Sequence, residues 1–272
     1  MTPSSDGETS LLLWFMAAVV VLLAAYLFVG WLRRTHDREG WREVLGPVLL
    51  AATVLGLGMS AAMLLAMSAG GLAFPLGYRW LAVPALVFGP VIGCVPAAWW
   101  LSRQQNWLAM IGSGLLLAAV ALAVQTGWIL AAGLRPGIKW QFALLGAAAV
   151  LETAGFVAAL WLAFSGTGAN SARRSLWRAG AAALLALTLI AGQEVVSASV
   201  ALLAQVGSIY QREAQATWLC LVAGAILPTI LAVLALDLTL RNRSGRGRSS
   251  RNGGVELNLP QRRKRRRRYR AL

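Results

Sequence analysis

Residues 45–69 read LGPVLLAATVLGLGMSAAMLLAMSA, an uninterrupted run without a single charged side chain. An α-helix rises about 1.5 Å per residue, so about 20 apolar residues cross the roughly 30 Å hydrocarbon core of a bilayer. This run is therefore long enough to span a membrane. Its glycines and alanines also predict close packing against neighbouring helices, because small side chains let helix backbones approach one another.

Six other segments share this character, and together they predict a seven-helix membrane bundle. The chain has 272 residues, of which 58% are hydrophobic and only 13% are charged. Soluble domains are nearer half apolar and a quarter charged. We expect an all-α polytopic membrane helix bundle, with a short external N-terminus at 1–10, a membrane module at 11–240 and a tail at 241–272. The expected spans are residues 11–32, 45–69, 80–101, 107–131, 141–164, 179–206 and 217–238.

The distribution of basic residues predicts how the bundle is oriented. The first, third and fifth connectors and the tail hold most of the 25 Lys and Arg residues, whereas the opposite side holds only Arg79, Arg135, Lys139 and Arg212. Cytoplasmic connectors carry the excess of basic residues. We therefore predict a multi-pass inner-membrane protein with its N-terminus outside and its C-terminus in the cytoplasm.

The tail carries most of the formal net charge of +15. Its basic residues are accompanied by a single acid, Glu256, and such a composition predicts disorder because it cannot bury a core. Beside a membrane, each basic residue adds about 1 kcal/mol of attraction to anionic lipid. Nucleic acid is the alternative partner for this charge, but the tail contains no folded reader. The expected lipid-binding residues are Arg262, Arg263, Lys264, Arg265, Arg266, Arg267 and Arg268.

Three of the spans share a direction and a similarly placed exceptional residue, which together predict one shared site. The second, fourth and sixth spans run in the same direction, and each carries an exceptional residue in its second half. These residues are Met63, Gln125 and the pair Gln193 and Glu194. Three parallel helices that place such groups at one depth predict a common polar or metal-binding site in the outer half of the membrane. Simple packing of lone polar side chains in a bundle is the alternative.

The three repeats also carry related short motifs. The first has GLGMSAAMLLAM at 56–67 and FPLGY at 74–78, and the second has VQTG at 124–127 and PGI at 136–138. The third has AALWLAF at 158–164, RAGAA at 178–182 and AGQE at 191–194. Through these motifs the chain resembles the MHYT domain, a bacterial seven-helix membrane module named for a recurring Met-His-Tyr-Thr sequence. The resemblance covers about residues 10 to 240 and implies a sensor of copper, or of diatomic gases through copper.

The chain departs from that family at the metal-binding positions. Where the family has its three motif histidines, this sequence has Met63, Gln125 and either Gln193 or Glu194. A candidate copper site nevertheless remains, because Met59, Met63 and Met67 share one helix face and thioethers suit Cu(I). Together with Glu194 they form the candidate metal ligands. Packing of a methionine stripe in the core is the alternative.

Two acidic residues fall near the middle of their expected spans. A carboxylate at that depth is costly and is expected to face the bundle or a wet cavity. Glu152 and Glu194 could share a proton or hold a cation, which would make the chain a transporter or a proton or cation pathway component. Alternatively, each forms hydrogen bonds that support helix association, with Gln193, Gln125, Ser197 or Thr153 as partners. The candidate polar core or ligand-binding residues are thus Gln125, Gln193, Glu194 and Glu152.

Nothing in the sequence predicts an enzyme. The only histidine, His36, lies in a charged connector, which argues against a histidine base or a zinc site of the usual type. No Ser-His-Asp set and no H-E-x-x-H motif is evident. We expect a non-enzymatic, sensor-like or regulatory membrane protein whose partners are membrane lipids and a cytoplasmic protein. Besides the transporter, a scaffold without a ligand is a third interpretation.

Overall fold

The structure is a computed structural model that describes residues 6–35, 40–69, 77–104, 106–135, 138–165, 171–202, 207–208, 210 and 214–237. Within these residues, seven helices are long and apolar enough to cross a membrane, which confirms the predicted all-α polytopic bundle. The spans are Leu11–Arg34, Trp41–Ala69, Ala82–Arg103, Trp107–Ala131, Phe142–Ser165, Ser175–Ala198 and Trp218–Asp237. The predicted tail at 241–272, with Arg262, Arg263, Lys264, Arg265, Arg266, Arg267 and Arg268, lies outside the described residues.

Five of the helices begin and end close to where the hydropathy pattern predicts. They are α2 (Trp41–Ala69), α3 (Ala82–Arg103), α4 (Trp107–Ala131), α5 (Phe142–Ser165) and α1 (Asp6–Arg34), the last of which starts a few residues early. Local chemistry explains the start of α4, where the Asn106 side chain accepts a hydrogen bond from the Ala109 amide at 2.8 Å. A side-chain cap of this kind satisfies one of the free N–H groups in the first helical turn.

The sixth span was predicted at 179–206, whereas the observed span, Ser175–Ala198, begins about one turn earlier and ends about two turns earlier. Helix α6 runs from Ser171 to Ala198, and the chain then forms strand β4 (Val200–Leu202). The predicted end was wrong because Val200–Leu202 is apolar, and hydrophobicity alone does not distinguish a short apolar strand from the continuation of an apolar helix. The correction moves Glu194 from the middle of a helix into its last turn.

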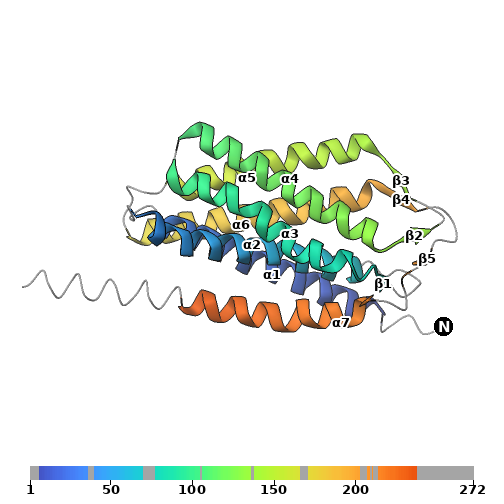
Figure 1. Ribbon diagram of the computed structural model, residues 1–272. Helices are drawn as coiled ribbons and strands as arrows, with labels where there is room; N and C mark the ends of the chain where they lie inside the picture. Colours follow the sequence, from blue (N-terminus) through green and yellow to red (C-terminus); the bar gives the residue numbers. More distant parts are fainter. Residues whose placement is uncertain are drawn as a thin grey trace, which may run out of the picture. The chain divides into compact units, whose positions relative to one another are not determined.

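In the described parts of the connectors, three short antiparallel strand pairs lie at one end of the bundle, which we call the strand end (Figure 1). The connector after α6 supplies one strand to each pair. Strand β4 pairs with β3 (Ile138–Trp140), β5 (Gly207–Ser208) pairs with β2 (Leu134–Arg135), and β6 (Ala214–Gln215) pairs with β1 (Gly77–Tyr78). This single connector is therefore bound to the connectors that follow both α2 and α4.

The packing order of the bundle explains which helices can build a site. Helix α1 packs most extensively against α2 and also against α6, while α5 packs against α4 and α6. Helix α2 is the most deeply buried span and also contacts α3 and α4. Because α2, α4, α5 and α6 all face the interior, polar side chains on these helices can meet there without contact with lipid.

The last span differs from the others in both regularity and burial. It begins with α7 (Ala216–Leu221), continues through a π-helical turn, η1 (Val222–Ile226), and ends in helix at 227–237. It packs against α2 and α1, but only a small share of its side chains is buried in the bundle. We therefore place the candidate site on the more buried helices.

Candidate functional site: a buried polar cluster on α4, α5 and α6

A hydrogen bond between a carboxyl group and an amide lies in the centre of the bundle. Gln125 Nε2 on α4 donates to Glu152 Oε1 on α5 at 2.6 Å. Glu152 is completely buried, and Gln125 is 4% exposed. Buried polar groups must form hydrogen bonds to offset the loss of water, so this bond ties α4 to α5 within the apolar interior.

The pair leaves hydrogen-bonding capacity unused. Glu152 Oε2 and Gln125 Oε1 are buried and have no hydrogen-bond partner. A buried polar atom without a partner costs about 1–3 kcal/mol. Such atoms in native structures therefore call for an explanation, and a bound ligand or water molecule is one of them.

Two glycines bring α5 and α6 together beside this pair. A Cβ atom at Gly192 of α6 would lie 2.2 Å from Glu152 Oε1 and 2.6 Å from Glu152 Cγ. In the same way, a Cβ at Gly155 of α5 would lie 2.2 Å from the hydroxyl oxygen of Thr188. The absence of a side chain at Gly192 leaves room for Glu152, and its absence at Gly155 leaves room for Thr188.

A small cavity adjoins Gln125 on the side of α2 and α6. It is lined by one thioether and two amide side chains, those of Met59, Gln125 and Gln193, together with apolar residues of α1, α2, α4 and α6. The centre of a water-sized sphere can move within about 10 Å³ there, which is close to the minimum for holding one water molecule. The site can therefore hold a single water-sized species against two amides.

The structure thus brings Gln125 and Gln193 together, as the repeat analysis predicted for the fourth and sixth spans. The methionine that joins them in the cavity is Met59, one helical turn from the predicted Met63. Met63 is buried in the same helix but does not line this cavity. The prediction chose Met63 from its place in the repeat. Met59 and Met63 share one face of α2, and sequence spacing alone does not show which turn of that face lies level with Gln125 and Gln193.

Glu194 occupies a different environment from the one predicted. It lies in the last turn of α6, its side chain is exposed, and Oε1 accepts a hydrogen bond from Trp14 Nε1 of α1 at 3.2 Å. It lines a second small cavity, with Trp14 and Gln193 among the other lining residues. The prediction of a buried Glu194 in mid-span is therefore wrong, because the predicted end of the helix was too late.

The four candidate metal ligands do not line a single cavity. Met59 lines the first cavity and Glu194 the second, while the Met67 sulfur accepts a hydrogen bond from the Tyr78 hydroxyl at 3.9 Å. Among the residues that the structure describes, no group of three or more His, Cys, Asp or Glu side chains could hold a metal ion. The donor set around the first cavity is one sulfur and two amides, which suits a hydrogen-bonding ligand better than Cu(I).

A third group of polar side chains, which the sequence analysis missed, lies near the strand end. Tyr78 is fully buried and packs edge-on against Trp128 with the ring centres 5.1 Å apart. Cys220 of α7 contacts the hydroxyl of Ser68 at 2.8 Å. Burial, with a smaller effect from Cys220, raises the pKa of Tyr78 above its ordinary value. The FPLGY motif at 74–78 was the available signal, but it does not reveal the partners on α4 and α7.

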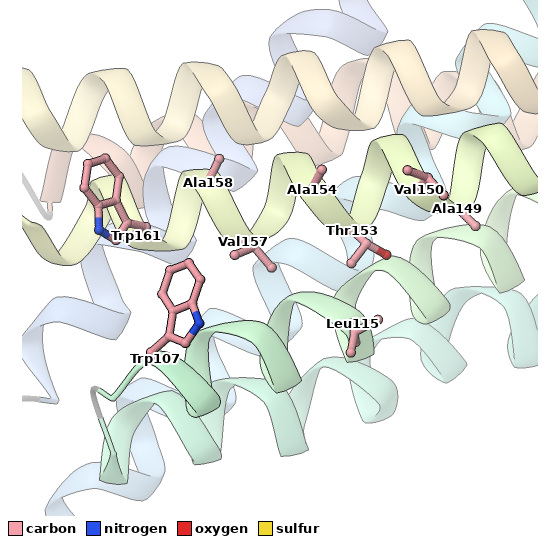
Figure 2. Close-up of a pocket in the computed structure, with 9 residues that line it drawn as sticks. All are labelled: Trp107, Leu115, Ala149, Val150, Thr153, Ala154, Val157, Ala158 and Trp161. Atoms are coloured by element: carbon pink, nitrogen blue, oxygen red, sulfur yellow. The ribbon is translucent and has the colours of Figure 1, made fainter.

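An apolar groove of about 740 Å³ runs along the surface between α4 and α5. Figure 2 shows Trp107 and Trp161 at one end of this groove and Leu115, Ala149 and Val150 at the other. Thr153 is the single polar residue among its lining residues. Because the groove is open and almost entirely apolar, it contributes no polar chemistry to the buried cluster.

We expect the substitution Gln125→Leu to destabilise the bundle by about 2 kcal/mol, because it leaves both oxygens of the buried Glu152 without a partner. The midpoint of unfolding in detergent with increasing dodecyl sulfate measures this effect. Glu194→Gln is the control and should change stability by less than about 0.5 kcal/mol, since Glu194 is exposed. Equal effects of the two substitutions would contradict the central role of the Gln125–Glu152 bond.

The fold and this cluster define a class: a polytopic seven-helix membrane protein with a buried polar cluster on three of its helices. One curated relative, the bifunctional diguanylate cyclase/cyclic di-GMP phosphodiesterase MucR of Pseudomonas aeruginosa, is 29% identical over 174 residues. The match covers 63% of this chain but only 25% of that protein. No protein-family profile and no solved structure matches the chain, so the resemblance to the MHYT domain stays a prediction.

Proposed function

We propose that this chain is a non-enzymatic, sensor-like or regulatory membrane protein whose responsive element is the cluster of Gln125, Glu152 and Gln193. The observation that carries this proposal is the buried Gln125–Glu152 hydrogen bond, in which two oxygens have no partner, together with a water-sized cavity that Gln125 and Gln193 line. Because this cluster has unused hydrogen-bonding capacity, it can exist in two states, one with a bound ligand and one without. A change between them alters the contacts among α4, α5 and α6.

The ligand that this site favours is small and polar. The cavity holds about one water molecule, and its amides offer both donors and acceptors. Copper, which the resemblance to the MHYT domain implied, has weaker support from this donor set, because Cu(I) prefers soft sulfur ligands and only Met59 supplies one. We therefore propose binding of a single water-sized polar species.

The similarity to MucR supports a place in signalling. That relative is a diguanylate cyclase and cyclic di-GMP phosphodiesterase, and the chain matches only a quarter of it. We propose that the chain serves as a membrane-embedded component that regulates a cytoplasmic partner acting on a cyclic dinucleotide. The basic residues support an N-terminus outside and a C-terminus in the cytoplasm of the inner membrane, with anionic lipid bound by the tail.

The test replaces Glu152 with glutamine in the full chain. Glu152→Gln keeps the size of the side chain and its bond to Gln125 but replaces the unpaired oxygen, an acceptor, with an NH2 group, a donor. In a bacterial host that makes cyclic di-GMP, we expect the unmodified chain to shift the cellular level at least about twofold and Glu152→Gln to abolish the shift. Glu194→Gln, the same chemical change at an exposed position, should retain it.

Two outcomes would overturn this proposal. The first is that the unmodified chain leaves the level of cyclic di-GMP unchanged, and the second is that both glutamine variants abolish the shift equally. A proton flux into liposomes that needs Glu152 would instead support the transporter interpretation. The structure gives that alternative less support, because Glu152 is bound to Gln125 whereas Glu194 is bound to Trp14.

A further inference from the structure

Two small cavities lie next to each other between α1, α2 and α6. The inner cavity is the one that Gln125 lines, and the outer cavity is the one that Glu194 lines. Each has room for about one water molecule. They share the lining residues Val21, Ala62 and Gln193. One side chain from each of the three helices therefore forms the boundary between them.

The outer cavity lies between the inner cavity and the strand end. On α1 its lining extends from Val21 back to Trp14, and on α2 it extends from Ala62 on to Ala66. Helix α1 begins and helix α2 ends at the strand end (Figure 1). Both helices therefore show that the outer cavity continues from the inner one toward the connectors.

The outer cavity ends at two exposed side chains. Trp14 is 45% exposed and Glu194 is also exposed, and Trp14 Nε1 donates a hydrogen bond to Glu194 Oε1 at 3.2 Å. Such a bond can open without loss of the fold, because water replaces both partners. Gln193, which follows in the wall, is only 8% exposed, and its amide can both donate and accept a hydrogen bond. The outer cavity thus leads from exposed groups to a buried amide.

We propose that the outer cavity is the entrance to the inner one. An uncharged, water-sized polar molecule enters between Trp14 and Glu194, binds at the amide of Gln193 and passes from there to the cavity beside Gln125. This inference rests on the proposed function, in which the inner cavity holds such a molecule. Ions are excluded, because a space for one water molecule cannot hold a hydrated ion and burial of a bare ion is far more costly than burial of a neutral group.

Hydrogen peroxide, an uncharged polar molecule only slightly larger than water, can probe this route. It oxidises a methionine by transferring one oxygen atom to the sulfur, and the remainder leaves as water. Met59 lines the inner cavity, whereas Met63, one turn further along α2, is also buried but lines neither cavity. In the purified full chain in nanodiscs, we expect Met59 to be oxidised at least about tenfold faster than Met63. Mass spectrometry after short exposures measures both rates.

Filling the outer cavity should slow the oxidation of Met59. Ala66→Leu and Ala18→Leu each enlarge a side chain in its wall, from α2 and from α1. Each should lower the rate at Met59 about fivefold and leave the rate at Met63 unchanged, since the added atoms occupy a space for only one water molecule. The control is Ala147→Leu, the same change at an exposed position of α5 that lines neither cavity. It should alter the rate by less than about twofold.

Three results would refute the route: equal oxidation rates at Met59 and Met63, a normal Met59 rate in both cavity-filling variants, or an equal slowing by Ala147→Leu. These rates do not depend on cyclic di-GMP. The route can therefore fail while the response to Glu152→Gln stands. Conversely, the proposed function can fail while Met59 is still oxidised through the outer cavity.

Discussion

The substitution Gly56→Ala is expected to separate α2 from α3 and to destabilise the bundle by about 3 kcal/mol. A Cβ atom at residue 56 would lie 2.5 Å from the Val91 nitrogen, 2.7 Å from the Val91 Cα and 2.8 Å from the Pro90 carbonyl carbon. These are backbone atoms, which cannot move aside as a side chain can. The two helices must therefore shift as a whole, and the contacts between them are lost along their length.

Dodecyl sulfate titration of the purified chain in mixed micelles measures the effect on stability. Gly89→Ala on α3 is a matched control, because a Cβ there would meet no atom within 4 Å. The control should be neutral or should stabilise the helix by about 0.5–1 kcal/mol, since alanine loses less backbone entropy than glycine. A variant Gly56→Ala as stable as Gly89→Ala would show that α2 and α3 are not in close contact.

The second large effect is expected from Gly192→Ala at the polar cluster. The added methyl group would occupy the space of the Glu152 carboxyl group, with 2.2 Å to Oε1 and 2.8 Å to Cδ. Glu152 must then leave its position and lose its bond to Gln125. We expect a loss of stability of about 2–3 kcal/mol, from overpacking together with the broken hydrogen bond.

A double-mutant cycle separates this effect from general damage to α6. In a chain that already carries Glu152→Ala, the methyl group of Gly192→Ala enters the vacated space, so its additional cost should fall by about 2 kcal/mol. The same dodecyl sulfate titration gives the four stabilities. If the cost of Gly192→Ala is unchanged in the Glu152→Ala chain, the two side chains do not compete for one volume and the geometry of the cluster is wrong.

The predicted and observed spans agree where the limits of a helix coincide with charge or with a strong helix boundary. Arg103 ends α3, and Asn106 supplies the cap that begins α4. The hydropathy pattern predicted the end of α6 wrongly, because Val200–Leu202 is as apolar as the helix before it. What ends α6 is the pairing of this segment with Ile138–Trp140, a contact between residues about sixty positions apart that no local pattern contains.

The candidate site was likewise predicted only in part from the sequence. Composition singled out Gln125, Glu152, Gln193 and Glu194 as exceptional groups in apolar surroundings, because the cost of polar side chains in hydrocarbon makes them stand out in any sequence. The sequence could not show that Gln125 bonds with Glu152, while Glu194 turns to Trp14. Those choices depend on how far each helix is rotated and how closely its neighbours approach.

The sequence by itself therefore determined that the chain forms seven apolar helices, because the need to satisfy backbone hydrogen bonds in a bilayer leaves long apolar segments few alternatives to the helix. It also contained the positive charge that predicts the orientation. Only the tertiary structure decided which polar groups share the interior. The glycines at 56, 155 and 192 set how closely the helices approach, and a helix rotation of one residue, about 100°, changes which side chain faces inward.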